Sequence, residues 1–292
     1  MGLCFSEKGD WIEMKKQWLK HFAAVIAALS ATATLLTASF NLDCVKECWL
    51  YSLIVVVFVL ATSIIYASWQ IRSKKEILLN LSSEFKVIVK EGDLFAEKGV
   101  ICIPFNEYFD THVGDGVVGK ETLHGIFINK YFSDRIDELR EKIENALAGK
   151  QSTEHARRVE GCPTKQYPLG TCISIRDGEN TYVLFALTHF DGNDKVNVGR
   201  SEFTAVIGKL TKYLSETVEN RPVFLPLFGT GLSRINRTPQ RILLHIIDTI
   251  DFDDTCIIPG GINIIIKSLE KMDVNLNTVE YVVKQGIIEK EA

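Results

Sequence analysis

Several chemical signatures are missing from this 292-residue sequence. Its seven cysteines include no CxxC pair, a spacing typical of zinc and redox sites. No HxxE-type metal set and no Ser/His/Asp arrangement emerges, so neither a metal site nor a catalytic residue is predicted. Cys44 and Cys48 could pair in an oxidising compartment or stay free. Four others are scattered through the later chain, as is typical of reduced cytosolic thiols: Cys102, Cys162, Cys172 and Cys256.

A net positive charge is missing from most of the chain. Residues 1–79 carry eight Lys/Arg and six Asp/Glu, a net of +2, which leaves 25 against 31, a net of −6, for residues 80–292. Nucleic-acid binding depends on Lys and Arg to neutralise phosphates, so this acidic part argues against a general nucleic-acid partner. A single small anion stays possible, because a few backbone amides can hold one.

Formal charges are absent from two long apolar runs, residues 21–42 and residues 48–71. As a helix, the second run would span about 36 Å, more than the roughly 30 Å hydrocarbon core of a bilayer. A cleaved signal peptide would have a shorter apolar core and no second run behind it. The sequence therefore predicts a transmembrane hairpin over residues 1–80, with helices at about 20–41 and 49–71.

The flanks of the two runs predict their orientation. Three lysines precede the first run, Arg72 and two lysines follow the second, and the loop at 43–47 has one lysine and two acids. By the positive-inside rule both termini are cytoplasmic and the loop is outside. The first run also carries small residues suited to close helix packing, within the hairpin or between copies: Ala27, Ala28, Ser30, Ala31 and Ala33.

Beyond the hairpin, strands and helices are predicted to alternate. Residues 72–83 are expected to continue as a helix, residues 149–168 to form a loop, and Ser133 to cap a helix. Strands are predicted at 85–89, 99–103, 171–176, 182–188, 222–227 and 262–267, and helices at 133–148, 201–218 and 238–250. This alternation indicates an α/β domain over residues 81–292, a sheet sandwiched between helices.

Three glycine-containing stretches follow predicted strands: residues 91–95 (EGDLF), 114–119 (GDGVVG) and 227–233 (LFGTGLS). Residues 114–119 have the glycine spacing GxGxxG, but they do not directly follow a predicted strand, as the dinucleotide fingerprint requires. None of the three stretches has the P-loop pattern GxxxxGK[ST]. Ligands of α/β sheets bind at the carboxyl ends of strands, where glycine lets backbone N–H groups approach a diphosphate. Each stretch alone is more typical of a turn, but the three together favour a phosphate-binding site.

The motifs in this region resemble a macro domain, a fold that binds ADP-ribose. They are Gly92-Asp93, residues 103–111 (IPFNEYFDT), residues 123–128 (LHGIFI) and residues 226–234 (PLFGTGLSR). More specifically, they resemble the macro domain of the two-transmembrane-helix effectors of type II Thoeris anti-phage defence, the ThsA family. The resemblance covers residues 85–267, and the predicted hairpin fits the same architecture. It implies a multi-pass protein of the bacterial inner membrane with a cytoplasmic macro domain.

The resemblance implies ligand contacts at particular residues. Asp93, with Leu94 beside it, matches the acid that hydrogen-bonds the adenine amino group, and Asn106 matches the asparagine at the distal ribose. From the residues alone, Asp93 could equally cap a turn. The remaining implied contacts are a first diphosphate loop (Gly114, Gly116, Val117, Gly119), a second one (Phe228, Gly229, Thr230, Gly231, Leu232, Ser233), and three further side chains (Asp110, His124, Arg234).

The resemblance implies a sensor rather than an enzyme. The loop GDGVVGKE at 114–121 lacks the adjacent glutamates of glycohydrolase-like macro domains. In the family, a NAD-consuming TIR-domain partner makes an ADP-ribose derivative, a histidine conjugate, and no metal or other cofactor is implied. The macro domain binds this signal, the chain assembles into a homo-oligomer, and the membrane helices compromise the envelope of the infected cell. The alternatives are a membrane-anchored ADP-ribosylhydrolase and an anchored domain without a ligand.

Overall fold

The computed structural model describes residues 19–20, 22–27, 30, 57–58, 60–65, 74–81, 86–114, 116–155, 161–190, 196–231, 235–252 and 257–291. The chain divides into two compact units, residues 1–74 and 75–292. Most of the two predicted membrane helices, with Cys44 and Cys48, lies outside the described residues. Within the described part of the chain, no helix is both long enough and apolar enough to cross a membrane.

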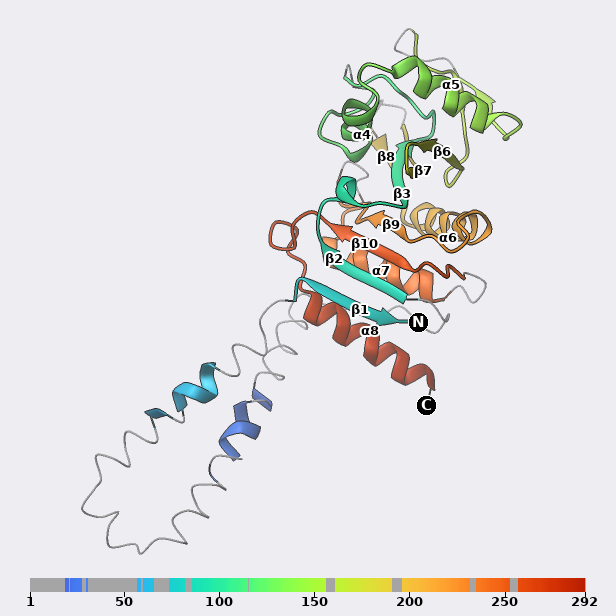
Figure 1. Ribbon diagram of the computed structural model, residues 1–292. Helices are drawn as coiled ribbons and strands as arrows, with labels where there is room; N and C mark the ends of the chain where they lie inside the picture. Colours follow the sequence, from blue (N-terminus) through green and yellow to red (C-terminus); the bar gives the residue numbers. More distant parts are fainter. Residues whose placement is uncertain are drawn as a thin grey trace, which may run out of the picture. The chain divides into compact units, whose positions relative to one another are not determined.

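The second unit is built on one mixed sheet (Figure 1). Its strands follow the order β1-β2-β10-β9-β3-β7-β6. The five inner strands run parallel to one another, while β1 and β6 are antiparallel strands at the two edges. The strands are β1 (Glu76–Asn80), β2 (Lys86–Glu91), β3 (Val100–Asn106), β6 (Cys172–Asp177), β7 (Asn180–Phe190), β9 (Val223–Pro226) and β10 (Ile262–Ile266).

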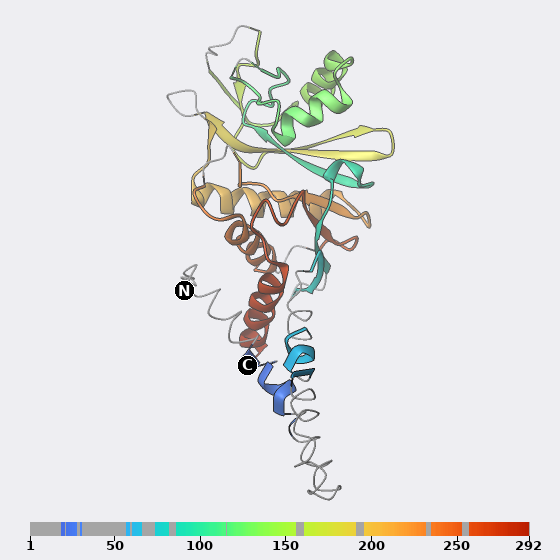
Figure 2. The same ribbon diagram turned by 90° about the vertical axis from the view of Figure 1, so that its left-hand side faces the viewer.

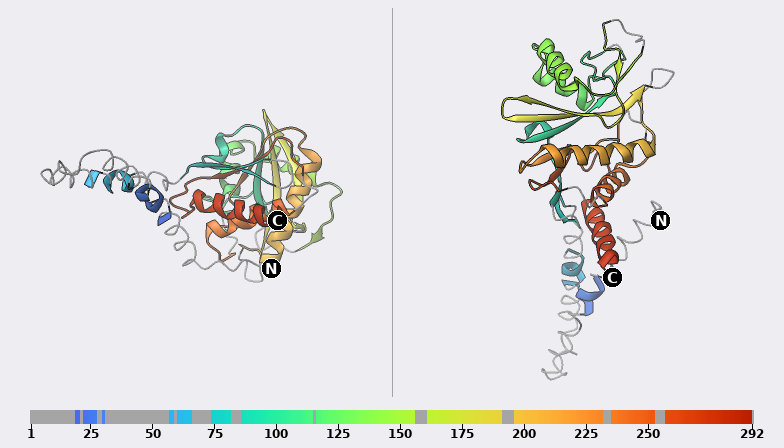
Figure 3. Two further views of the ribbon diagram at one scale, coloured as in Figure 1. Left: turned by 90° about the horizontal axis from the view of Figure 1, so that it is seen from below. Right: turned by 90° about the vertical axis from the view of Figure 1, so that its right-hand side faces the viewer.

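Helices cover both faces of this sheet (Figures 1 and 2). On one face lie α4 (Leu123–Tyr131) and α5 (Ile136–Leu147), whose apolar side chains share a buried cluster with β3, β6 and β7. On the other face lie α6 (Arg200–Thr217) and α7 (Pro239–Asp251). The C-terminal helix α8 (Leu276–Glu291) contacts α7 and β1 (Figure 3). The predicted sheet sandwiched between helices is confirmed.

The central strand β3 shows why an interior strand of this sheet has a nearly continuous apolar sequence. Its side chains alternate between the two faces: Val100 and Cys102 join the cluster under α6, whereas Ile101, Ile103 and Phe105 join the cluster under α4 and α5. A strand buried on both faces needs apolar residues at every position rather than at every second one. The strand ends at Asn106, where a shift in the pairing register with β7 interrupts the ladder.

Two predictions about secondary structure are wrong. Residues 72–83 do not continue as a helix, because β1 occupies residues 76–80 and pairs with β2. Ile77 and Leu79 are buried while their neighbours are exposed, and this period of two is that of a strand. Ser133 does not cap a helix, because α5 begins at Ile136 after Arg135.

Short elements were also absent from the predicted set. The expected loop at 149–168 contains two short paired strands, β4 (Thr153–Glu154) and β5 (Lys165–Gln166). A single 3-10 turn, η1 (Leu94–Ala96), follows β2, and the two-residue strand β8 (Val196–Asn197) pairs with β7. Elements this short carry too little sequence periodicity to be recognised.

Candidate functional site

The carboxyl ends of the five parallel strands meet at one edge of the sheet, and most of the predicted site residues lie there. Gly92 after β2 donates its N–H to Ile266 of β10 (2.9 Å), and Leu227 after β9 donates to Ile265 (3.2 Å). Asn106 ends β3 between β9 and β7. The topology therefore assembles the segments that begin at Gly92, Asn106 and Leu227 along one edge, the usual ligand position of open α/β sheets.

Asp93 begins the turn after β2. Its Oδ1 accepts a hydrogen bond from the Phe95 N–H at 3.0 Å and caps η1, while the side chain stays exposed to solvent. Leu94 is buried in the core, and the Phe95 carbonyl accepts a hydrogen bond from the Tyr131 hydroxyl of α4 at 3.1 Å. Asp93 therefore does cap a turn. The exposed carboxylate, held by that turn, can still accept a hydrogen bond from a ligand.

Asn106 organises the turn that follows β3. Its Oδ1 accepts hydrogen bonds from the N–H groups of Tyr108 (3.1 Å) and Asp110 (3.2 Å), which fixes which end of the amide is oxygen. Its Nδ2 donates to Asp110 Oδ2 at 3.0 Å. Asn106 and Asp110 are 5 % and 0 % exposed, so the two predicted side chains form one buried pair. The amide has a second N–H that this bond does not use.

Phe109 holds the same turn in an unusual conformation. Its φ of 53° lies in the left-handed region, which is uncommon for a bulky residue. The ring is 1 % exposed and packs against Phe105 (5.9 Å between centroids) and Tyr167 (5.7 Å). Such conformations persist where the surroundings determine them, and they are common at functional sites. The packing of Phe109 therefore fixes the position of the Asn106–Asp110 pair.

His124, on the first turn of α4, anchors this turn from the other side. Its Nε2 lies 2.7 Å from the Asp110 carbonyl oxygen, which can only accept, so Nε2 carries the proton. The ring is 7 % exposed and lies 3.5 Å from the Phe105 ring, centroid to centroid. Burial lowers the pKa of His124 to about 3, although the hydrogen bond to Asp110 opposes this shift. His124 is therefore neutral near pH 7, with Nδ1 as an acceptor.

The first glycine loop is a tight turn. The Gly114 N–H donates to the Val118 carbonyl and the Val117 N–H donates to the Gly114 carbonyl, both at 2.9 Å. Gly114 (φ 118°) and Gly116 (φ 76°) adopt backbone conformations that favour glycine. Val117 and Val118 are buried. Residues 107–113 separate the loop from the end of β3, so its glycines do not directly follow the strand as the dinucleotide fingerprint requires.

This loop is attached to the N-terminus of α4. The Thr122 hydroxyl donates to the Gly119 carbonyl at 2.7 Å and accepts from the Gly125 N–H at 3.0 Å, so it both caps the helix and holds the loop. A Cβ at Gly125 would overlap the Gly119 carbonyl oxygen. The loop therefore lies against the positive end of the helix dipole, which favours a nearby anion.

The second glycine loop follows β9. Gly229 has φ 89°, and a Cβ there would approach Ile235 and Phe203 to 2.8 Å. Phe228 is 3 % exposed and packs against Phe203 (5.4 Å) and Phe185, so its side chain belongs to the core. A Cβ at Gly231 would meet open space, and the preceding Thr230 is half-buried. The remaining predicted contacts of this loop lie outside the described residues: Leu232, Ser233 and Arg234.

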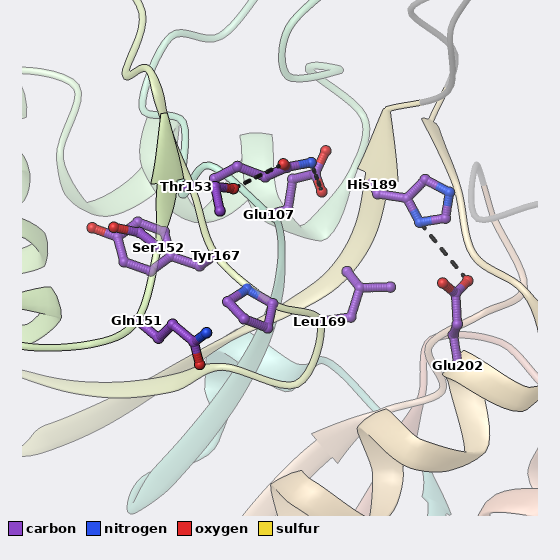
Figure 4. A pocket seen from close by; sticks show the side chains of 10 residues that line it. Glu107, Gln151, Ser152, Thr153, Tyr167, Leu169, His189 and Glu202 are labelled. Atoms are coloured by element: carbon purple, nitrogen blue, oxygen red, sulfur yellow. Dashed lines mark hydrogen bonds and ion pairs between the residues drawn. The ribbon is translucent and has the colours of Figure 1, made fainter. Parts of the chain in front are cut away.

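A pocket of about 340 Å³ opens beside this edge, at the end of β7 (Figure 4). Glu107 directly follows Asn106, and its N–H donates to the Thr188 carbonyl of β7 at 2.9 Å. None of the predicted site residues lines the pocket. Glu107 lies within the motif at residues 103–111, but the sequence alone does not indicate its burial. The lining residues are Glu107, Gln151, Ser152, Thr153, Gln166, Tyr167, Pro168, Leu169, His189 and Glu202.

The comparisons with known proteins agree with this geometry. Residues 87–267 match a family model described as "Thoeris protein ThsA, Macro domain". Thoeris protein ThsA of Bacillus amyloliquefaciens (strain Y2) is 28% identical over 214 residues, which cover 72% of this chain and 70% of that protein.

Solved macrodomains of Oceanobacillus iheyensis are similar in fold. A mutant with ADPR is 12% identical, with a TM-score of 0.50 over 72% of this chain and 99% of the other. The same macrodomain with ADP is 11% identical, with a TM-score of 0.50 over 72% and 97%. The second unit thus has the fold of a macro domain. Because the family match spans more than half of the sequence, the chain belongs to the family of Thoeris ThsA macro-domain proteins.

Proposed function

We propose that this chain is a membrane-anchored sensor and effector of bacterial anti-phage defence, whose macro domain binds an ADP-ribose-derived signal. The observation that carries the proposal is the placement of the two glycine loops, Asp93 and Asn106 at one edge of the sheet, within the segment that matches the family. A related fold from Oceanobacillus iheyensis carries ADPR in its solved structure.

The geometry suggests how the nucleotide would lie. The exposed Asp93 carboxylate would accept a hydrogen bond from the adenine amino group. The diphosphate would lie across the two glycine loops, near the N-terminus of α4, where backbone N–H groups can approach it. The distal ribose would reach the buried Asn106–Asp110 pair, whose remaining amide N–H can donate to a hydroxyl.

The attached hairpin connects this binding site to a membrane effect in the proposal. A TIR-domain partner that consumes NAD would supply the signal, a conjugate of histidine and ADP-ribose. Binding would favour a homo-oligomer, because a ligand shifts an equilibrium towards the state that it binds better. The helices at about 20–41 and 49–71 would then disrupt the inner membrane. The macro domain and both termini would face the cytoplasm.

Nucleotide binding is tested with Asp93→Ala. ADP-ribose at a hundred times its dissociation constant stabilises a binding protein by about 2.7 kcal/mol, and this raises the melting temperature of the wild type. The variant should lose most of this shift, because it lacks the carboxylate at the adenine. Asp134→Ala is the matched control, since Asp134 is exposed between α4 and α5. A full shift in Asp93→Ala would refute the placement of the adenine.

The predicted topology is tested at Cys44 and Cys48. In intact spheroplasts, a membrane-impermeant maleimide should label these two loop cysteines after mild reduction. It should not label Cys162, which is partly exposed in the macro domain. Labelling of Cys162 before lysis would place the domain on the outer side and refute the orientation.

An ADP-ribosylhydrolase with the same architecture is the alternative function. The buried His124 is neutral near pH 7 and its protonated nitrogen is bound to a carbonyl, so it does not suit general acid catalysis. Incubation of the purified protein with the histidine conjugate distinguishes the two functions. A sensor releases the conjugate intact, whereas a hydrolase releases ADP-ribose over many turnovers.

A further inference from the structure

The direction of β1 determines where the chain enters the second unit. The first unit ends at residue 74, and β1 begins at Glu76 on the edge of the sheet, beside β2 (Figure 1). Because β1 is antiparallel to β2, its start lies next to the end of β2, and the Glu91 N–H donates to the Lys75 carbonyl at 2.9 Å. The chain therefore enters at the carboxyl edge, where the candidate nucleotide site lies. A parallel β1 would have begun at the opposite edge.

The Glu91 side chain joins Lys75 to a third segment. Its Oε2 lies 3.4 Å from Lys75 Nζ, and its Oε1 accepts a hydrogen bond from the Leu269 N–H, just after β10, at 3.1 Å. The Glu91 side chain is 26 % exposed and that of Lys75 is 84 % exposed. An ion pair this open to solvent contributes little to stability. Its main effect is to hold Lys75 at the ends of β2 and β10.

The end of β2 also leads directly into the turn predicted to contact adenine. The Gly92 N–H donates to the Ile266 carbonyl at 2.9 Å, and the exposed Asp93 caps η1. Only two peptide units separate Glu91 from Asp93, so their Cα atoms are at most about 7 Å apart. Among the described residues, no backbone hydrogen bond joins residues 75–80 to either glycine loop. A displacement of the Gly92–Asp93 turn therefore reaches Lys75 through Glu91.

We propose that Glu91 is a positioning residue that couples occupancy of the Gly92–Asp93 turn to the segment before β1, which leads from the predicted hairpin. The inference rests on the proposed function, because it requires a nucleotide at Asp93 and a membrane effect of the hairpin. A ligand that shifts Asp93 also shifts the end of β2. The backbone bond and the carboxylate of Glu91 then transmit this displacement to Lys75.

Dye release from liposomes that contain the full-length protein tests this role, with the histidine conjugate of ADP-ribose as the probe. Glu91→Gln keeps an oxygen that can accept the Leu269 N–H and loses the charge that faces Lys75. The conjugate concentration for half-maximal release should rise about threefold, in keeping with the modest strength of an exposed ion pair. The dissociation constant of the conjugate, measured by calorimetry in detergent, should stay unchanged.

Glu97→Gln is the matched control. Glu97 Oε1 lies 2.8 Å from Lys90 Nζ, so this ion pair is closer and less exposed than that of Glu91 with Lys75. Its loss should cost at least as much stability, but Glu97 lies on the far side of the turn from Lys75 along the chain. Dye release should therefore need the same conjugate concentration as in the wild type. An equal rise in both variants would reveal a general loss of stability and overturn the role of Glu91.

A disulfide tests the same link covalently. Facing residues that exchange backbone hydrogen bonds have Cα atoms about 5.5 Å apart, a distance that a disulfide can span. Lys75→Cys/Glu91→Cys should respond weakly to the conjugate when reduced and recover the response when oxidised. The oxidised wild type is the control for the native cysteines. No recovery, with the disulfide verified by mass spectrometry, would overturn the assignment.

The wild type separates failure of this inference from failure of the proposed function. Binding of the conjugate without dye release would overturn the coupling and leave nucleotide binding intact. Absence of binding in calorimetry would overturn the proposed function itself.

Discussion

The neutral, buried His124 makes the stability of the domain depend on pH. The unfolded chain has an ordinary histidine with a pKa near 6.5, whereas burial lowers the pKa of the folded side chain to about 3. Between these values the unfolded state binds a proton that the folded state does not. The contribution of His124 to the free energy of unfolding is therefore fully present above pH 6.5. It is lost progressively as the pH falls from 6.5 towards 3.

The loss of stability at pH 5.0 follows from the pKa of the histidine in the unfolded chain alone. Because pH 5.0 lies well above the folded pKa, the cost is about 1.4 kcal/mol for each of the 1.5 units between 6.5 and 5.0, or about 2 kcal/mol. His124→Gln removes the titration and keeps an N–H that can donate to the Asp110 carbonyl. From pH 7.5 to 5.0 the wild type should thus lose about 2 kcal/mol more than this variant.

Pulse proteolysis in urea at the two pH values measures this difference, because it reports the population of unfolded domain. Tryptophan fluorescence is unsuitable, since all four tryptophans precede residue 75. All other titratable groups are the same in the two proteins, so their contributions to the pH dependence cancel in the comparison. His245→Gln, at an exposed position on α7, serves as the control and should lose as much stability as the wild type. Equal losses in the wild type and His124→Gln would refute the reasoning.

Three other predictions concern glycine, helix termination and thiols. Gly125→Ala should destabilise the domain by about 1–3 kcal/mol in urea titrations, because its Cβ overlaps the first glycine loop. Gly208→Ala, in open space on α6, should instead stabilise it by up to about 1 kcal/mol. Glu219, just beyond α6, has φ 47°, so Glu219→Gly should raise the free energy of unfolding by up to about 1 kcal/mol, and a loss would contradict this. Burial raises the pKa of Cys172 to about 12 and that of Cys102 well above its usual range. Iodoacetamide should therefore label neither thiol at pH 7.5 until the protein unfolds, as peptide mass spectrometry would show.

Local sequence was informative where burial leaves a strong pattern. The strand β9 is a short, continuous apolar run, and β10 is apolar except at Asn263, because both faces of a central parallel strand are covered. The helix α7 was recognisable from Thr238-Pro239 at its start and from its apolar spacing. The strand β1 was misread because it follows a long helical pattern, and its alternation spans only residues 76–80. Its identity as a strand depends on pairing with β2, which is a tertiary contact.

The features of the candidate site also divide into those that the sequence indicated and those that only the structure revealed. The glycines of both loops could be selected from the sequence, because turns that need φ > 0 restrict residue type locally, whereas the role of Asp93 is implied by the family resemblance. The resemblance also implies Asn106 and Asp110, but their mutual hydrogen bond depends on the tertiary structure. Phe228 was selected for its place in a motif, and the structure places its ring in the core against Phe185 and Phe203.

The sequence by itself determined the α/β alternation, the apolar interior strands and the glycine loops, since each depends on neighbours within a few positions along the chain, and the hairpin stays a prediction. Only the tertiary structure decided which segments share the carboxyl edge, because that depends on the order in which distant strands pair. It also decided the pocket of Glu107 and Glu202, because Glu107 directly follows β3 and Glu202 lies on α6. Burial and the pairing of polar groups depend on contacts far apart in sequence, and no local pattern records them.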